Sequence, residues 1–249
     1  MLNKADLIFP DWPASVNVRA LQTTRVGGVS VAFYDSLNLA GHVGDDALKV
    51  AANRQLLSPY VPTEPLWLNQ VHGITVVDAA IASCLPDADA SFTKAPNVVC
   101  ATMTADCLPV LLCDEAGTVV SAVHAGWRGL CDGVIEAAVA AMQTPPKNLM
   151  AWLGPAIGPN AFEVGLEVRT AFMSQTKEAE LAFGAVADDK WLGDIYLLAK
   201  QRLHKLGVER IYGGGLCTYT DQARFFSFRR DGATGRMASL IWLDGHAEA

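Results

Sequence analysis

Two histidines and one cysteine stand at places in the sequence where a folded sheet would bring their side chains together. His124 ends the strand-like run 118–123, and Cys107 stands at the start of the apolar run 108–113. His72 lies in a Gly-containing turn just before a further strand-like run. A thiolate and two imidazoles are ligands for zinc, and three protein ligands leave the fourth tetrahedral position to water or substrate. The same Cys107 and His124 also suit a nucleophile and its base.

A predicted hairpin is the element that would place Cys107 beside His124. The runs 108–113 and 118–123 are separated only by a short turn that contains Gly117. A connection this short requires antiparallel pairing, in which the start of one strand lies next to the end of the other. His72 would join them from the turn before 74–77. Spacing alone leaves both the metal site and the cysteine–histidine dyad open.

The rest of the chain predicts a mixed α+β fold. Helices and strands are interleaved without a regular βα alternation, so we expect a mixed β-sheet core flanked by helices. No long linker, charge block or repeat divides the chain, which predicts a single domain over residues 1–249. The further strands are expected near 98–99 and at 239–243, and the helices at 45–57, 130–142, 164–173 and 194–206, the last ended by Gly207.

Composition excludes several classes of function. The chain has 249 residues, of which 51% are hydrophobic, and this is enough to bury a large core without disulfides. A formal charge of −7 disfavours nucleic acid as a partner. No apolar run approaches the ~20 residues of a membrane span, and a charged residue precedes any apolar run at the N-terminus. We therefore expect a soluble, cytoplasmic protein with no membrane partner, whose six cysteines stay thiols.

The remaining histidines carry weaker signals. His204 lies on a polar helical face and His246 near the C-terminus, so both are expected to be exposed. His42 stands in a loop flanked by glycine, and its role stays open. No phosphate-loop or dinucleotide fingerprint occurs in the sequence.

Seven segments, in order along nearly the whole chain, resemble the YfiH-type family. That family was formerly labelled a multicopper polyphenol oxidase or laccase domain and is now described as purine nucleoside phosphorylase. The resemblance implies that His72, Cys107 and His124 are the metal ligands. The segments are TTR at 23–25, SLNL at 36–39, QVHG at 70–73, TADCLP at 104–109, HAGWRG at 124–129, GPAIGP at 154–159 with FEVG at 162–165, and 227–236.

The resemblance implies a zinc enzyme that cleaves adenosine, inosine or 5′-methylthioadenosine with phosphate and also deaminates adenosine. Zinc lowers the pKa of a bound water to about 7, which suits deamination. Phosphate needs a receptor, and Arg128 at a predicted helix start is the first candidate, with Arg25 and Arg229 next. Glu163 is a further substrate-binding candidate. Either Asp106 or Glu163 would orient a ligand histidine or protonate the leaving base.

Three other interpretations compete with a zinc phosphorylase. A multicopper oxidase needs many histidines in His-x-His pairs, whereas this chain has five histidines and no such pair. A single copper with Cys107, two histidines and Met103 fits by ligand type, so copper is an alternative metal. A Cys107–His124 hydrolase uses the same two residues without metal. A binding module without turnover has no particular support, and the sequence does not indicate an oligomeric state.

Overall fold

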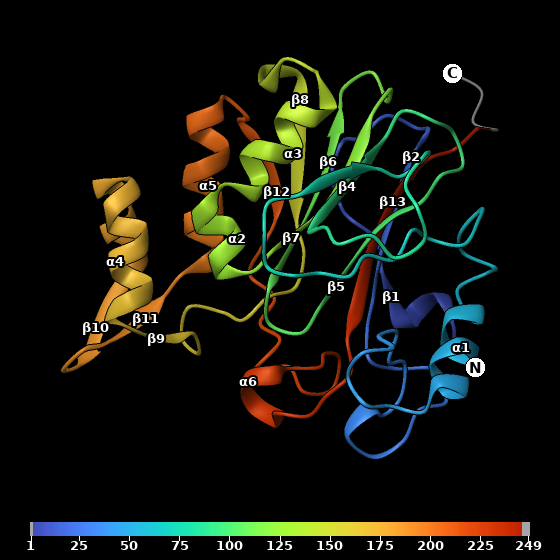
Figure 1. Ribbon diagram of the computed structural model, residues 1–249, viewed down its shortest axis with the longest axis horizontal. Coiled ribbons are helices and arrows are strands. Elements are labelled where there is room, and N and C mark those ends of the chain that lie inside the picture. Colours follow the sequence, from blue (N-terminus) through green and yellow to red (C-terminus); the bar gives the residue numbers. More distant parts are fainter. Residues whose placement is uncertain (1, 246–249) are drawn as a thin grey trace.

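The computed structural model describes residues 2–245, and it has the mixed α+β architecture that the sequence predicts (Figure 1). Two sheets form the main body, and a third forms a projecting arm with α4. The six-stranded sheet has the order β12 (Arg210–Gly213), β8 (Leu149–Leu153), β6 (Leu108–Asp114), β7 (Val120–Ala125), β4 (Ala90–Thr93) and β3 (Val76–Asp78). The four-stranded sheet has the order β1 (Leu7–Ile8), β2 (Val18–Thr23), β13 (Met237–Leu243) and β5 (Cys100–Thr104). The arm has the order β10 (Phe183–Ala187), β11 (Lys190–Gly193) and β9 (Glu163–Gly165).

The six-stranded sheet is a middle layer with an apolar core on each face. Its β7 packs against β5 and β13 of the four-stranded sheet, while α3 and α5 cover the opposite face. Along β6, Leu108, Val110 and Leu112 lie in the core on the helix side, and Leu111 and Cys113 lie in the core between the sheets. The sequence of a strand that is buried on both faces is one continuous apolar run, because alternate side chains enter different cores.

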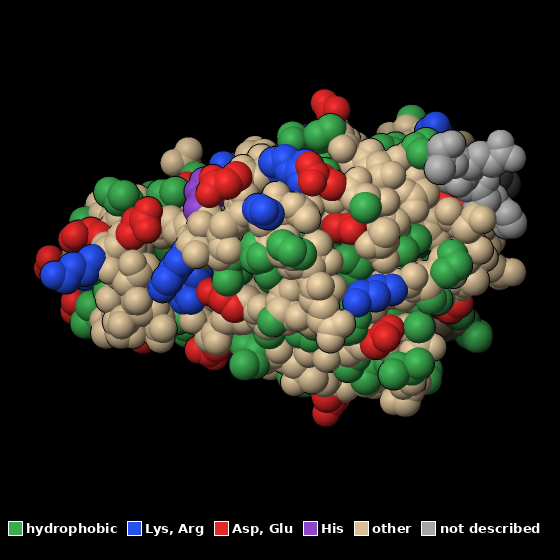
Figure 2. Space-filling view, turned by 90° about the horizontal axis from the view of Figure 1, so that it is seen from above, with side chains coloured by type: hydrophobic (Ala, Val, Ile, Leu, Met, Phe, Trp, Pro, Cys, Tyr) green, Lys and Arg blue, Asp and Glu red, His purple; other side chains and the backbone are tan. Residues whose placement is uncertain are grey.

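The helices lie around these layers and pack mainly on the helix-side core (Figure 1). They are α1 (Ala47–Gln55), α2 (Trp127–Asp132), α3 (Val134–Met142), α4 (Leu166–Gln175), α5 (Ile195–Leu206) and α6 (Phe228–Asp231), with 3-10 turns at Lys4–Asp6, Ala32–Tyr34, Pro146–Asn148 and Lys177–Ala182. None of the helices within residues 2–245 is long and apolar enough to cross a membrane. On the face seen in Figure 2, acidic and basic side chains are interspersed over the described residues.

The predicted hairpin is confirmed by the pairing of β6 with β7. Leu108 pairs with Ala125 and Pro109 with His124, in antiparallel register. The turn is held by the Asp114 carboxylate, which accepts hydrogen bonds from the backbone and hydroxyl of Thr118. Cys107 therefore precedes β6 at the same edge of the sheet where His124 stands, one residue before the end of β7.

Two helix predictions were wrong in their boundaries, and one helix end was right. The helix predicted at 130–142 is split into α2 and α3, because Gly133 takes a left-handed φ of 106° that breaks the helical path. The segment predicted as helix at 164–173 begins as β9, and α4 starts only at Leu166. Gly207 caps α5 in the left-handed conformation, as predicted.

Candidate metal centre

Four strand ends meet at one edge of the two packed sheets and surround a cavity. β5 ends at Thr104 opposite Met237, the first residue of β13, and β7 ends near His124 opposite the start of β6. The cavity has a volume of about 320 Å³. Its wall includes the predicted His72, Cys107, His124, Asp106 and Arg229, together with His42, Met103, Trp127, Phe162, Phe228 and Arg236.

The structure brings the three predicted metal ligands together. One ligand atom from each of His72, Cys107 and His124 lies within 4.8 Å of the others. The Cys107 Sγ is 3.9 Å from the His72 Nε2, and the two imidazole centroids are 4.9 Å apart with their planes at 73°. His124 is buried, Cys107 is half-buried and His72 is exposed, so the cluster opens to solvent on the His72 side. One soft sulfur and two nitrogens form a donor set that suits zinc or copper.

The carboxylate of Asp89 fixes both histidines at once. The His124 Nδ1 donates to the Asp89 Oδ1 over 2.8 Å, which leaves Nε2 as the nitrogen free to act as a ligand. The same carboxylate accepts backbone N–H bonds from Val71, His72 and Gly73 at 3.2, 2.9 and 2.6 Å. These bonds hold the turn in which His72 takes a left-handed φ of 60°. Asp89 is fully buried, and although burial alone would raise its pKa, the bonds from His124 and the backbone lower it.

Cys107 and His124 shift each other's protonation in the metal-free site. Burial disfavours the Cys107 thiolate, but the charge and hydrogen bonds of His124, with those of His72, outweigh burial and lower the thiol pKa to about 6. Burial likewise disfavours the His124 imidazolium, and the charge of Cys107 and the Asp89 hydrogen bond outweigh it and raise the pKa to about 9. Both shifts favour a thiolate on Cys107 beside an imidazolium on His124.

Two glycines let the start of α2 approach the His72 turn closely. A Cβ at Gly126 would lie 2.8 Å from the His72 Cδ2 and 3.1 Å from the Cys107 Sγ. A Cβ at Gly129 would lie 2.8 Å from the backbone oxygen of Gly73. Both distances are shorter than ordinary contacts, so neither position has room for a side chain.

The two acids named from the sequence do not contact the ligand histidines. Asp106 accepts from the Thr218 hydroxyl and from the backbone N–H of Arg229, each at 2.6 Å, and thereby joins the start of α6 to the loop at 218. Glu163 is exposed and pairs with Lys190 at 2.9 Å. The acid that contacts a ligand histidine is Asp89, which the sequence reasoning missed. Its signal was an aspartate between Ala88 and Ala90, directly before a strand.

The predicted arginines lie in different places. Arg229 lines the cavity, and its Nη1 donates to the backbone oxygen of Glu163 over 2.8 Å. Arg128 lies 4.4 Å from the centroid of the Trp127 ring and is not among the lining residues. Its helix, α2, begins at Trp127 and has only six residues. Arg25 is also outside the lining, and its side chain donates to the backbone oxygens of Asp35 and Gln222.

Arg236 and His42 also line the cavity, although the sequence reasoning gave neither of them a role. Burial, followed by the charges of Arg236 and Arg54, lowers the pKa of His42. His204 is exposed, as predicted, and His246 lies outside the described residues.

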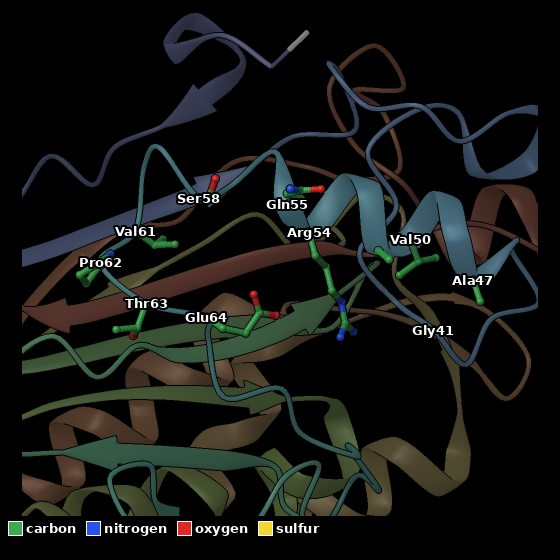
Figure 3. Close-up of a pocket in the computed structure, with 11 residues that line it drawn as sticks. Gly41, Ala47, Val50, Arg54, Gln55, Ser58, Val61, Pro62, Thr63 and Glu64 are labelled. Carbon is green, nitrogen blue, oxygen red and sulfur yellow. The ribbon is translucent and has the colours of Figure 1, made fainter.

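A second hollow lies beside α1 and is separate from the metal ligands. Its volume is about 620 Å³, and Figure 3 shows Arg54 projecting from α1 toward the side where Glu64 lies. The Arg54 guanidinium stacks on Trp67 at 4.2 Å, and its Nε donates to the backbone oxygen of Leu39. Among its lining residues there is no histidine or cysteine, so this larger hollow lacks the donor set of the first.

Comparison with known proteins gives matches over nearly the whole chain. The family model described as multi-copper polyphenol oxidoreductase laccase matches residues 19–244. Purine nucleoside phosphorylase YfiH of Escherichia coli (strain K12) is 55% identical over 240 residues, which cover 95% of this chain and 98% of that protein. Purine nucleoside phosphorylase PA4543 of Pseudomonas aeruginosa is 54% identical over 237 residues, with 95% and 98% covered. The crystal structure of Neisseria meningitidis protein NMB0706 superposes with a TM-score of 0.94 at 52% identity, covering 96% of this chain and 100% of that one.

Proposed function

This chain belongs to the YfiH family, and from that premise we propose that it is a purine nucleoside phosphorylase. The observation that carries the proposal is 55% identity, across 95% of the chain, to a protein of that name. In phosphorolysis a phosphate oxygen bonds to C1′ of the nucleoside, and the C1′–N9 bond breaks with its electron pair on the purine. The base takes up a proton and leaves, and the sugar 1-phosphate remains. We propose adenosine, inosine and 5′-methylthioadenosine as the nucleosides, and deamination of adenosine as a second activity.

We propose that His72, Cys107 and His124 hold a zinc ion. Their donor atoms lie within 4.8 Å of one another, and the bond from His124 to Asp89 favours Nε2 as the ligand atom. When bound, zinc acts as a Lewis acid and lowers the pKa of a coordinated water to about 7, which is the chemistry that deamination needs. We place the reaction in the cytoplasm, because all six cysteines are unpaired and a thiolate ligand must stay reduced.

The chain's own residues would bind and orient the nucleoside. The cavity of about 320 Å³ is within the range of small-molecule sites. Trp127, Phe162 and Phe228 line it and offer apolar faces to a purine ring. Arg229 offers a positive charge from the same wall. Arg25, Arg128 and Glu163 stay proposals as substrate contacts, and each would first have to leave the partners described above.

Two alternatives have some support. The laccase description of the family model favours copper, and Met103 lines the cavity beside the three ligands. The lowered pKa of Cys107 and the raised pKa of His124 favour a metal-free cysteine hydrolase, since such enzymes use a thiolate–imidazolium pair. Thiol alkylation separates the hydrolase from the metal enzyme, because zinc protects a ligated thiolate and leaves a catalytic dyad reactive.

Metal analysis and product analysis test the proposal. Protein purified without added metal should contain about one zinc per chain, and Cys107→Ala should lose it. Cys113→Ala, a buried cysteine of β6 that faces the other sheet, is the matched control and should keep the zinc. Full zinc retention in Cys107→Ala would refute the ligand set.

For the reaction, adenosine or inosine with phosphate should give the free base and ribose 1-phosphate, and omitting phosphate should stop base release. Adenosine should still give inosine and ammonia without phosphate. Arg128→Ala should reduce phosphorolysis more than deamination if Arg128 holds phosphate. Base release that does not depend on phosphate would show a hydrolase instead.

A further inference from the structure

Arg236 is a cation in the wall of the metal-ligand cavity whose hydrogen-bonding capacity is only partly used. Its Nη1 donates to the backbone oxygens of Thr234 and Gly235 at 2.9 and 3.1 Å. Its Nε and Nη2 have no hydrogen-bond partner within residues 2–245, and no carboxylate of that range pairs with it. Burial lowers its pKa, while the charges of Cys107 and Asp106 oppose that effect. Neither Nε nor Nη2 is among the buried polar atoms without a partner, so both can be reached by an anion that enters the cavity.

The backbone holds Arg236 in a fixed place at the start of β13. Its N–H donates to the Asn38 side chain over 3.0 Å, and its carbonyl accepts from the Leu39 N–H. Its guanidinium carbon lies 5.8 Å from the centroid of Phe228, which lines the same cavity. The side chain therefore does not need a loop movement to remain in the wall. A rigid, preorganised fork of N–H donors is the arrangement that binds phosphate oxygens in pairs.

The other half-buried arginines already have partners. Arg202 pairs with Glu136 at 3.0 Å, and Arg230 pairs with Asp231 at 2.7 Å. The Arg54 guanidinium lies over the Trp67 ring, 4.2 Å from its centroid, beside the second hollow. Within residues 2–245, both arginine side chains in the cavity wall donate only through Nη1, but Arg229 is exposed, whereas Arg236 is half-buried.

We propose that Arg236 is the receptor for the phosphate co-substrate, which it holds through Nε and Nη2 within the cavity of the metal ligands. The proposal rests on the proposed phosphorylase function, because phosphorolysis requires a residue that binds phosphate. It places the phosphate beside the start of β13 and not at the Arg128 helix start. Arg236 changes no covalent bond. It binds and orients the anion whose oxygen attacks C1′.

The test compares Arg236→Gln and Arg236→Lys with wild type. In Arg236→Gln, KM for phosphate should rise about 10- to 100-fold, because charged hydrogen bonds to the anion are lost. KM for inosine, zinc content and phosphate-independent deamination should change little. Arg236→Lys keeps the positive charge but loses the paired N–H donors, so its KM for phosphate should lie between those of wild type and Arg236→Gln. If Arg236→Gln does not fold, Arg236→Lys takes its place in the comparison with wild type. Arg54→Gln is the matched control, because it removes a half-buried guanidinium from the other hollow, and its KM for phosphate should be that of wild type.

A second measurement does not depend on turnover. Inorganic phosphate should raise the Tm of wild type and of Arg54→Gln, and this shift should be lost in Arg236→Gln. If Arg236→Gln keeps the wild-type KM for phosphate and the Tm shift, the proposal is overturned. It is also overturned if this variant loses zinc and deamination together with phosphorolysis, because Arg236 would then have a structural role. If wild type releases base without phosphate, the phosphorylase function fails. The Tm shift then still decides whether Arg236 binds the anion.

Discussion

Replacing Asp89 with asparagine should weaken zinc binding much more than its small change in size suggests. One carboxylate oxygen accepts from the His124 Nδ1 and the His72 N–H, and the other accepts from the N–H groups of Val71 and Gly73. An amide has only one acceptor oxygen, so its NH₂ group must face two of these four donors in either orientation. One donor stays unpaired if the His124 ring changes tautomer and two if the NH₂ group faces Val71 and Gly73. Each unpaired donor costs about 1–3 kcal/mol, so the free energy of unfolding should fall by about 1–6 kcal/mol.

The same substitution acts on the ligands directly. If the NH₂ group faces His124, the imidazole must place its proton on Nε2, which is the nitrogen that the metal needs. If it faces Val71 and Gly73, the His72 turn loses its anchor. In either case zinc affinity should fall about 10- to 100-fold. The assay is a competition for zinc against a coloured chelator, at a temperature where the variant is folded.

Asp114→Asn is the matched control for that experiment. Asp114 is also buried, and its carboxylate accepts from Thr118 and Val119 in the hairpin turn at the far end of β6. This variant should lose stability for the same reason but keep its zinc affinity. Wild-type affinity in Asp89→Asn, or an equal loss in both variants, would refute the reasoning.

Three further predictions follow from packing and protonation. Gly126→Ala should lose zinc, because the new methyl group would collide with a ligand ring and the ligand sulfur, whereas Gly41→Ala, which meets nothing within 4 Å, should keep it in the same metal analysis. In metal-free protein, alkylation of Cys107 should rise with pH around a midpoint of about 6 and be suppressed by zinc. Cys217 is a half-buried thiol outside the cavity. Burial raises its pKa, but hydrogen bonds outweigh burial and lower it. Peptide mapping should therefore find Cys217 alkylated both with and without zinc. Phe172→Ala, buried in α4, should lower the free energy of unfolding by about 3–5 kcal/mol in urea titration and leave zinc content unchanged.

The position of Cys107 beside His124 could be predicted because it depends only on local chain geometry. A short turn fixes antiparallel register, and register fixes which residues are opposite each other. The split of the predicted helix at 130–142 was missed because the apolar periodicity continues across Gly133, and only the left-handed φ of that residue breaks the helix.

The roles of Asp89 and Arg236 depend on long-range packing. Asp89 contacts His124 across 35 positions in sequence, and the Arg236 N–H bonds to Asn38 across 198. No spacing rule reaches that far. Asp106 and Glu163 were the nearest acids in sequence to the motifs, but the fold directs the first to Thr218 and the second to Lys190. Proximity in sequence was therefore a poor guide to which acid meets the histidines.

The close approach of α2 to the His72 turn gives a criterion for sorting related sequences. Glycine at a helix start is readily taken as a sign of an anion cradle, yet Gly126 and Gly129 lie where a ligand imidazole and the backbone of Gly73 leave no space. The absence of a side chain at these two glycines lets α2 pack against the His72 turn and Cys107. We expect a relative that keeps both histidines and the cysteine but carries a larger residue at either glycine to have shifted its His72 turn, and with it the proposed metal site. Such sequences would be the first in which to look for a member of the family that has exchanged its chemistry while keeping the fold.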